Sequence, residues 1–339
     1  MTAAVLCQFG LIEKDHTVQQ FGSGLINTTC IVENKSSGER FILQKINQAV
    51  FHSPTDIAHN IRMIADHLKQ HNPEYLFVAP IRAITGQDLA ISDGGFYRLF
   101  PFIKGSHTLD VVKNPGQAYE AAKQFGKFTR LLAGMDAGRL RITLPDFHNL
   151  SLRYQQFEKS LQKGNRERIK QSRDLIWFIQ QNRHILGEFE FNRLDFKTRV
   201  IHHDTKISNV LFDSNDKGLC VIDLDTAMPG YFISDVGDMM RTYLSPVSEE
   251  EKDNSLIWIR PEFYTAIVEG YLSEMGDTLL DVEKKYFGFA GKFMIYMQAI
   301  RFLTDHLNND EYYGCAYEGQ NFIRAVNQAT LLERLIEYE

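Results

Sequence analysis

The chain has 339 residues and a formal net charge of −6, with 44% hydrophobic and 24% charged residues. This length and composition are typical of a soluble globular protein with about two domains or lobes. Because the chain is acidic and contains no basic block, we expect neither nucleic acid nor an anionic membrane as its main partner.

The cysteines and the start of the chain indicate a cytoplasmic protein. The four cysteines lie far apart and form no C-x-x-C pair, so neither a disulfide framework nor a zinc site is predicted. They are expected to be reduced thiols: Cys7, Cys30, Cys220 and Cys315. The first residues lack the basic and apolar regions of a secretion signal, and no apolar window of about 18 residues predicts a membrane anchor.

Strand-like runs are concentrated near the front of the chain. "TTCIVEN" and "RFILQKI" are separated by the polar connection "KSSGE" and predict a hairpin. A helix is expected to follow, since Ser53 and Pro54 supply a cap and a first-turn proline and apolar residues recur at helical spacing over 57–68. Two further strands are predicted in "YLFVAPIRAI" (75–84) and "GFYRLFPFI" (95–103), separated by a connection containing Gly and Asp.

Helical periodicity dominates from about Pro115 onward, as in "AYEAAKQFGKFTRLLA" and "FMIYMQAIRFLTDHL". The pattern predicts an α+β protein with two lobes. A small antiparallel β lobe is expected over residues 1–101 and a larger, mainly helical lobe over residues 102–339, with Pro101 at the crossing.

One polar stretch interrupts the apolar pattern of the second half. "VIHHDTKISNVLF" (200–212) and the later "LCVIDLD" read as apolar runs joined by the turn "DSNDKG". A hairpin of this kind would bring together Asp204, Asn209, Asp223 and Asp225. Crowded carboxylates repel one another unless a cation joins them, and hard oxygen ligands suit magnesium. The arrangement predicts a site for a magnesium nucleotide.

The order of these residues resembles the catalytic loop shared by protein kinases and by small-molecule kinases of the aminoglycoside-phosphotransferase type. Those loops contain a catalytic Asp, a Lys two residues on and an Asn five residues on, followed by a metal-binding Asp after the next strand. Asp204, Lys206, Asn209 and Asp223 occur in that order and spacing. His203 stands where the small-molecule kinases usually carry Gly.

The occurrence of "HHDTK" with "VIDLDTAMPG" and "SDVGDMMR" makes the chain most similar to the N-acetylhexosamine 1-kinases, over residues 21–313. This resemblance implies a bilobal, protein-kinase-like fold, ATP and magnesium as cofactors, and a small sugar as substrate. The implied reaction is phosphorylation of the anomeric oxygen of an N-acetylhexosamine.

The resemblance also implies roles for the loop residues. Asp204 would accept the proton of the acceptor hydroxyl, and Lys206 would balance charge on the phosphoryl group. Asn209 and Asp223 would hold magnesium, and Asp225 would bind a second ion or its water shell. Any one of these residues alone would be better explained as a turn or cap residue. Four of them in fixed order favour the catalytic interpretation.

The front lobe is expected to hold the nucleotide. The loop "FGSGLINTT" would place backbone N–H groups near phosphates, and "YRLFPFIKG" resembles the segment that meets adenine. An ordinary hairpin turn and plain core packing remain alternatives. The predicted nucleotide contacts are Gly22, Ser23, Gly24, Asn27, Thr28, Lys45, Phe100 and Phe102.

The residues around the expected phosphate-binding lysine depart from the family pattern. A strand lysine normally pairs with a glutamate on the next helix, but "PTDIAHNIRMIADHL" contains no Glu. Lys45 is the candidate lysine. Successive strand residues face opposite sides, so a shift of one residue would place Gln44 towards the nucleotide instead.

The acceptor site is expected in the helical lobe. Arg301 and Asp305 are four residues apart and share a helix face, where they would bind sugar hydroxyls, and Tyr313 would add a ring and a hydroxyl. The alternative is a plain salt bridge between Arg301 and Asp305, with the tyrosine in packing. Asp235 and Asp238 are expected to brace the catalytic loop through hydrogen bonds to its backbone.

Three other functions remain open from the sequence. A kinase for choline, homoserine or an aminoglycoside would use the same catalytic residues. A phosphohydrolase with a His/Asp metal centre would use "HHD" and Asp223, but would leave Lys206 and Asn209 without a role. A pseudokinase would keep the fold without turnover, and the intact Asp204 and Asp223 argue against it.

Overall fold

The computed structural model describes residues 2–22 and 26–339. The chain divides into two compact units. The first unit comprises residues 1–108, 131–145 and 210–229, and the second unit comprises residues 109–130, 146–209 and 230–339. The lobe boundary near residue 101 stays a prediction.

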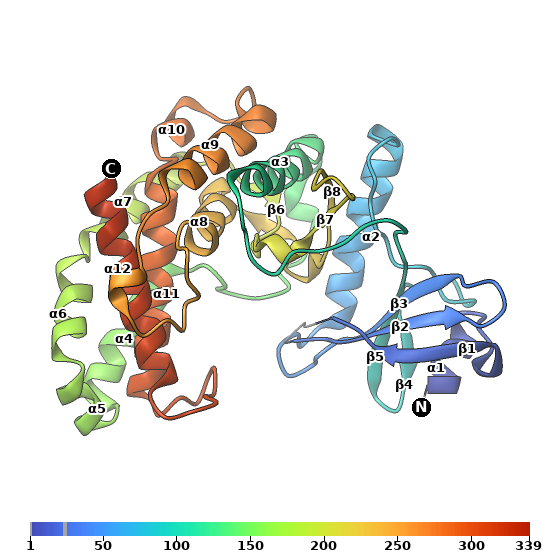
Figure 1. Cartoon of the computed structure of the whole chain (residues 1–339), viewed down its shortest axis with the longest axis horizontal. Coiled ribbons are helices and arrows are strands. Elements are labelled where there is room, and N and C mark those ends of the chain that lie inside the picture. Colours follow the sequence, from blue (N-terminus) through green and yellow to red (C-terminus); the bar gives the residue numbers. More distant parts are fainter. Residues whose placement is uncertain (1, 23–25) are drawn as a thin grey trace. The chain divides into compact units, whose positions relative to one another are not determined.

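An antiparallel sheet of five strands forms the centre of the first unit, in the order β1-β2-β3-β5-β4 (Figure 1). Alternating apolar residues of these strands face a shared core that includes Val32, Leu43 and Leu99. Helix α1 adds Val5 and Leu6 to the same core. The elements of the first unit are α1 (Thr2–Gln8), β1 (His16–Gln20), β2 (Thr28–Asn34), β3 (Arg40–Lys45), α2 (Pro54–His71), β4 (Ala90–Ser92), β5 (Gly95–Pro101), β7 (Val210–Phe212) and β8 (Gly218–Val221).

The predicted strands of this sheet are confirmed in part. The β2–β3 hairpin and β5 occur as expected. The strand predicted over 75–84 is wrong, because in that segment only Ile81 makes a β-bridge, to Leu99. Pro80 has no backbone N–H to donate to a ladder, which accounts for the interruption. The short strands β1 and β4 were not predicted from the sequence.

Helix α2 follows the predicted pattern. Ile57, Ile61 and Ile64 are buried on one face, as their spacing indicates. Ser53 occupies the N-cap position, but its side chain makes no capping hydrogen bond and instead lies 3.3 Å from the Thr55 hydroxyl. The predicted hairpin after the catalytic stretch is also present, since β7 and β8 pair antiparallel.

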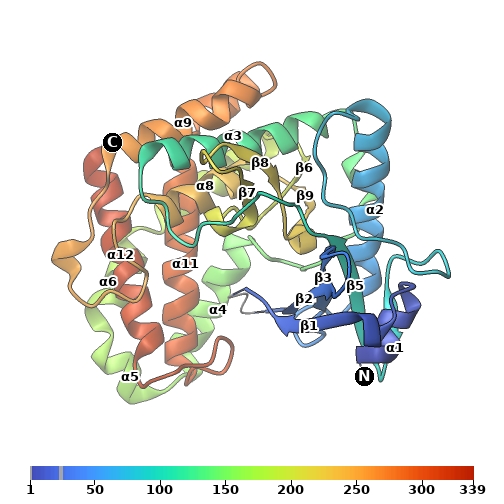
Figure 2. The same ribbon diagram turned by 45° about the vertical axis from the view of Figure 1, so that its right-hand side comes forward.

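The second unit is mainly helical. Helix α11 is at its centre and packs against α12, α8 and α4 (Figure 2). Nearly every residue of α11 from Phe289 to Ile300 is buried, as expected of a helix that is covered on several sides. Its elements are α3 (Pro115–Leu131), α4 (Leu150–Lys163), α5 (Arg166–Gln171), α6 (Arg173–Gln181), α7 (His184–Asn192), β6 (Arg199–Ile201), α8 (Phe232–Tyr243), α9 (Pro261–Met275), α10 (Asp281–Lys285), α11 (Phe289–Leu307) and α12 (Gln320–Tyr338). The remaining short strand is β9 (Met228–Gly230).

The α+β fold class predicted from the sequence is confirmed by these two units. The first unit supplies the antiparallel sheet and the second unit supplies most of the helices. Within the part of the chain that the structure describes, no helix is long and apolar enough to cross a membrane.

Candidate active site

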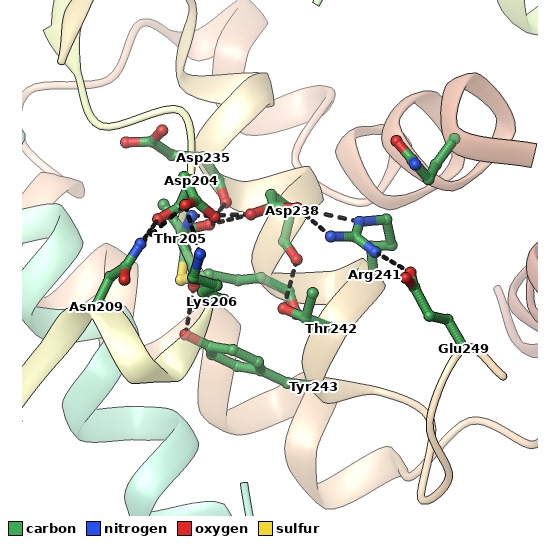
Figure 3. A network of polar contacts seen from close by, with 12 residues as sticks. Asp204, Thr205, Lys206, Asn209, Asp235, Asp238, Arg241, Thr242, Tyr243 and Glu249 are labelled. Atoms are coloured by element: carbon green, nitrogen blue, oxygen red, sulfur yellow. Dashed lines mark hydrogen bonds and ion pairs between the residues drawn. The ribbon is translucent and has the colours of Figure 1, made fainter. Parts of the chain in front are cut away.

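The predicted catalytic residues of the second unit lie together in the loop after β6. The Asp204 carboxylate accepts hydrogen bonds at Oδ2 from Lys206 Nζ at 2.9 Å and from Asn209 Nδ2 at 3.0 Å (Figure 3). Asn209 Nδ2 also donates to the Asp204 carbonyl oxygen at 2.9 Å. A single 3-10 turn over Ile207–Asn209 brings the asparagine back to the aspartate five residues earlier.

The environment of Asp204 keeps this carboxyl ionised. Burial alone would raise its pKa, but the charge and the hydrogen bond of Lys206 outweigh burial, and His202 and Asn209 add to them. The net effect is a pKa below the ordinary value of an aspartate. Asp204 is therefore ready to accept a proton at neutral pH.

Helix α8 fixes the backbone of this loop. The Asp235 carboxylate accepts from the backbone N–H groups of His202 at 3.1 Å and His203 at 2.7 Å. The Asp238 carboxylate accepts from the N–H of Thr205 at 2.8 Å, and the Tyr243 hydroxyl donates to the Thr205 carbonyl at 2.6 Å (Figure 3). The prediction that Asp235 and Asp238 brace the loop is confirmed.

The bracing network extends away from the loop through charged pairs. Arg241 donates to Asp238 at 3.0 Å and to Glu249 at 3.1 Å, and Arg324 donates to the same Glu249 carboxylate. Burial raises the pKa of Asp235 to about 6, despite the opposing effect of His202. Burial also raises the pKa of Asp238, against the charge of Arg241.

The backbone conformation of His203 is one that glycine adopts more readily than histidine. Its φ is 68°, in the left-handed region that residues with a Cβ rarely adopt. The His203 ring lies with its Nδ1 3.3 Å from Nδ1 of His148. A Cβ on Gly230 would lie 2.5 Å from Cε1 of His203, so this ring requires a glycine at position 230.

A buried polar cluster in the first unit surrounds Asp225. Arg98 on β5 donates to Asp225 Oδ1, and Asn27 donates to Asp225 Oδ2 at 2.7 Å. Both charged side chains are only 2% exposed. Gln44 Oε1 accepts from Arg98 Nε at 3.0 Å and Nη2 at 2.9 Å. The cation that meets Asp225 in this unit is therefore Arg98, which the sequence analysis did not identify.

The sheet register places Gln44 and Lys45 on opposite faces. Gln44 is opposite Arg98 on β5 and shares its face, whereas Lys45 is opposite Tyr97. The Lys45 ammonium lies 5.9 Å from the centre of the Tyr97 ring, and the side chain is exposed. The face that carries Asp225 is thus the Gln44 face. This register favours the alternative that places Gln44 rather than Lys45 towards the nucleotide, and contact of either residue with the nucleotide stays a prediction.

The remaining predicted nucleotide contacts are spread over the first unit. Gly22 has a φ of 79°, which a residue with a side chain would adopt only with strain. Ser23 and Gly24 lie outside the described residues. Thr28 begins β2 opposite Lys45. The aromatic residues stack on cations: Arg98 lies 5.1 Å from the Phe100 ring, and Arg40 lies 5.7 Å from the Phe102 ring.

The predicted metal ligands offer the hard oxygen atoms that magnesium prefers. Asp223 has a φ of 60°, a strained backbone that is common at functional sites. Asn209 uses its amide nitrogen for Asp204, so Oδ1 is the atom that a magnesium ion would bind. Both oxygens of Asp225 already accept hydrogen bonds within the protein.

The three residues predicted for the acceptor line one cavity of the second unit, between α4 and α11. Its volume is about 300 Å³. The cavity is lined by Arg153, Gln156, Lys159, Ser160, Lys163, Arg301, Thr304, Asp305, Asn308, Tyr312 and Tyr313.

Arg301 and Asp305 do not pair with each other. The Asp305 carboxylate accepts from the backbone N–H groups of Tyr312 at 2.7 Å and Tyr313 at 2.9 Å, so it shapes the cavity wall. Arg301 donates to Gln298 at 3.2 Å and lies 5.4 Å from the centre of the Tyr313 ring. The salt-bridge alternative for Arg301 and Asp305 is therefore wrong.

Several residues of these sites were missed from the sequence. Arg98 was detectable as one charge inside the apolar strand "FYRLF". Arg153 and His148 carried no local signal, because they meet Arg301 and His203 only through the packing of distant segments.

Comparisons with known proteins agree with this geometry. The model of the phosphotransferase enzyme family matches residues 17–279. The fold is similar to that of a microcompartment-associated aminopropanol kinase, with a TM-score of 0.69 and 15% identity over 99% of this chain and 97% of the other. It is also similar to an aminoglycoside phosphotransferase from Alicyclobacillus acidocaldarius, with a TM-score of 0.66 and 14% identity over 99% and 95% of the two chains. A third similar structure is a spectinomycin phosphotransferase in complex with ADP and spectinomycin, with a TM-score of 0.56 and 14% identity over 97% of this chain and 96% of the other.

The family model covers more than half of the chain, and we conclude that the protein is a kinase that belongs to the phosphotransferase enzyme family.

Proposed function

We propose that this kinase transfers the terminal phosphoryl group of ATP, with magnesium, to a hydroxyl group of a small metabolite. The acceptor that we propose is an N-acetylhexosamine, phosphorylated on its anomeric oxygen. The observation that carries the proposal is the ionised Asp204 carboxylate, which Lys206 and Asn209 hold in place at 2.9 Å and 3.0 Å.

The two oxygens of Asp204 have separate tasks in this mechanism. Both Lys206 and Asn209 donate to Oδ2. Oδ1 receives no hydrogen bond from the residues that the structure describes, so it is the oxygen that takes the proton of the acceptor hydroxyl. A positioned general base of this kind contributes about 10² to 10⁴ in rate.

Lys206 is positioned to balance the negative charge that develops on the phosphoryl group during transfer. Its side chain is 45% exposed while its ammonium rests on Asp204, so it is able to move towards the phosphoryl group as negative charge moves there. When bound, magnesium neutralises charge on the phosphate oxygens. Asp223 and Asn209 Oδ1 are the residues that would hold it.

The acceptor cavity favours a sugar over an amine. The similar structures include an aminopropanol kinase and a complex with spectinomycin, so an amine acceptor is the main alternative. An ammonium group would be repelled by Arg153 and Arg301 in the cavity wall. Sugar hydroxyl and acetamide oxygens accept hydrogen bonds from guanidinium groups, and the Tyr313 ring offers a surface for a pyranose.

The phosphohydrolase alternative fits the site less well. In a hydrolase, "HHD" would supply metal ligands. Here the backbone of both histidines is bound by Asp235, and the Asp204 carboxylate is bound by Lys206 and Asn209. A lysine that donates to the carboxylate lowers its availability to a metal, whereas phosphoryl transfer uses that lysine.

A phosphate-transfer screen tests the proposal. The purified protein is incubated with ATP and magnesium, and each of N-acetylglucosamine, N-acetylgalactosamine, choline, aminopropanol and spectinomycin is offered in turn. We expect a sugar 1-phosphate as product, and no transfer to the methyl glycoside, whose anomeric oxygen is blocked. Phosphorylation of the methyl glycoside would move the acceptor oxygen elsewhere, and preferential use of an amine would contradict the proposed acceptor.

A further inference from the structure

The acceptor cavity carries an excess of positive charge. Four of its lining residues are cations, and one is a carboxylate: Arg153, Lys159, Lys163, Arg301 and Asp305. The one carboxylate is already used by the protein, because it accepts from two backbone N–H groups and from Asn321 Nδ2 at 3.1 Å. These donors are neutral, so Asp305 contributes one negative charge against four positive ones.

The two arginines of the cavity donate hydrogen bonds only to uncharged oxygen atoms. Arg153 donates to Gln156 Oε1 at 3.1 Å and to the carbonyl of Asp146 at 2.9 Å, while Arg301 donates to Gln298 Oε1 at 3.2 Å. Within residues 2–22 and 26–339, neither guanidinium forms an ion pair with a carboxylate. Burial and the neighbouring charge of Arg301 lower the pKa of Arg153, which shows that the two cations repel each other.

The lining also contains buried polar atoms without hydrogen-bond partners. Arg153 Nε and Thr304 Oγ1 are both of this kind. An unpaired buried donor costs free energy on the order of 1–3 kcal/mol. Two guanidinium groups without a carboxylate partner among the described residues, in a cavity of about 300 Å³, are typical of a site that is completed by a ligand.

A row of aromatic rings connects the cavity with the catalytic loop. The Arg301 guanidinium lies 5.7 Å from the centre of the Phe147 ring, and Phe147 stacks on His148 with ring centres 4.4 Å apart. His148 in turn lies 5.2 Å from the His203 ring, and His203 precedes Asp204. These contacts link the Arg301 wall of the cavity to the residue that precedes Asp204.

We propose that the acceptor carries an oxyanion, a carboxylate or a phosphate, and that this group binds to Arg153 and Arg301 while the reacting hydroxyl group meets Asp204. This inference rests on the proposed function and specifies the charge of its substrate. Guanidinium groups bind carboxylate and phosphate through paired, charge-assisted hydrogen bonds. Such a ligand would supply the negative charge that the cavity wall lacks.

Matched acceptors test the inference. N-acetylglucosamine is compared with its 6-carboxylate, with the primary amide of that 6-carboxylate, and with its 6-phosphate. The amide has nearly the shape of the carboxylate without its charge. We expect kcat/KM to be at least about tenfold higher for one of the two acids than for the amide, and the acid that is preferred identifies the oxyanion. Equal values for acids and amide would overturn the inference and leave the sugar kinase intact.

Variants of the arginines test the location of the oxyanion. Arg301→Gln and Arg153→Gln should each raise KM for the preferred acid about tenfold more than they raise KM for the neutral sugar, with little change in KM for ATP. Arg173→Gln is the matched control, because Arg173 is exposed at the start of α6 and lies outside the cavity lining. An unchanged KM for the acid in both cavity variants would overturn the site.

Calorimetry separates failure of this inference from failure of the proposed function. The 6-carboxylate and its amide are titrated into the protein without ATP. Tighter binding of the carboxylate, lost in Arg301→Gln, supports an oxyanion site even if no sugar is phosphorylated. Tighter binding of choline or aminopropanol than of either acid would overturn the inference together with the proposed acceptor.

Discussion

The catalytic loop and the cavity belong to the same unit, but their charged side chains have different kinds of partner. In the loop, the carboxylates of Asp204, Asp235 and Asp238 all accept hydrogen bonds from nearby donors. In the cavity, Arg153 and Arg301 donate only to neutral oxygens. A buried charge is costly unless it is paired. The paired charges therefore hold the loop, and the arginines without a carboxylate partner are the basis of the proposed oxyanion site.

Side-chain contacts connect the catalytic loop with one wall of the cavity. The bracing network runs from Asp238 through Arg241 and Glu249 to Arg324. The Arg324 guanidinium lies 5.4 Å from the centre of the Tyr313 ring, which lines the cavity. The side chains that fix the catalytic loop thus also support a residue of the acceptor site.

The largest expected effect comes from the loop. Asp204→Asn should lower kcat by about 10² to 10⁴, because it removes the base while keeping the size of the side chain. The affinity for ATP should stay nearly unchanged. Steady-state kinetics and calorimetry measure the two quantities. Turnover within about threefold of the wild type would mean that Asp204 does not act as the base.

The buried ion pair of Arg98 and Asp225 in the first unit provides a second case of paired charge. Arg98→Met should lower the free energy of unfolding by about 3–5 kcal/mol, because it leaves the buried Asp225 carboxylate without its cation. The double variant Arg98→Met with Asp225→Asn should recover part of this loss. Urea unfolding measures both. A single variant as stable as the wild type would show that this pair does not stabilise the unit.

The pH dependence of stability tests the bracing of the loop. The pKa of Asp235 is raised to about 6, so between about pH 4 and pH 6 the unfolded chain releases a proton that the native state retains. The contribution of Asp235 to stability is therefore present at the acid end and is lost as the pH rises through this window, by about 3 kcal/mol at most.

Asp235→Asn removes this titration and serves as the matched variant. Its amide oxygen can still accept one of the two N–H groups of the loop. The difference in unfolding free energy between wild type and variant should shrink as the pH rises from 4 to 6. A difference that stays constant over this range would contradict the raised pKa. Titrations of other carboxylates are common to both proteins and cancel.

The smallest expected effect concerns the strand β3. Lys45→Met should change the affinity for ATP by about twofold or less, because Lys45 is exposed on the face opposite Arg98. Gln44→Leu should weaken ATP more, since it removes the acceptor that orients Arg98. Calorimetric titration with ATP compares them. The reverse order would identify Lys45 as the phosphate-binding cation.

Features that depend on neighbouring residues could be predicted from the sequence. Alternating apolar residues predicted β2, β3 and β5, and helical spacing predicted the buried face of α2. The order of Asp204, Lys206 and Asn209 predicted the catalytic loop, because one short turn is enough to bring these three side chains together. Patterns of this kind act over a few residues and can be read along the chain.

Which distant charged side chains come into contact depends on the packing of segments that lie far apart in the sequence. Arg98 and Asp225 are 127 residues apart, and no periodicity in the sequence relates them. The same holds for Arg153 and Arg301, which line one cavity from two different helices. Whether a charge is paired or left for a ligand depends on packing between segments and on the burial that it creates. The sequence alone therefore predicted the phosphoryl-transfer residues, whereas the excess of positive charge in the cavity depends on the packing of α4 against α11.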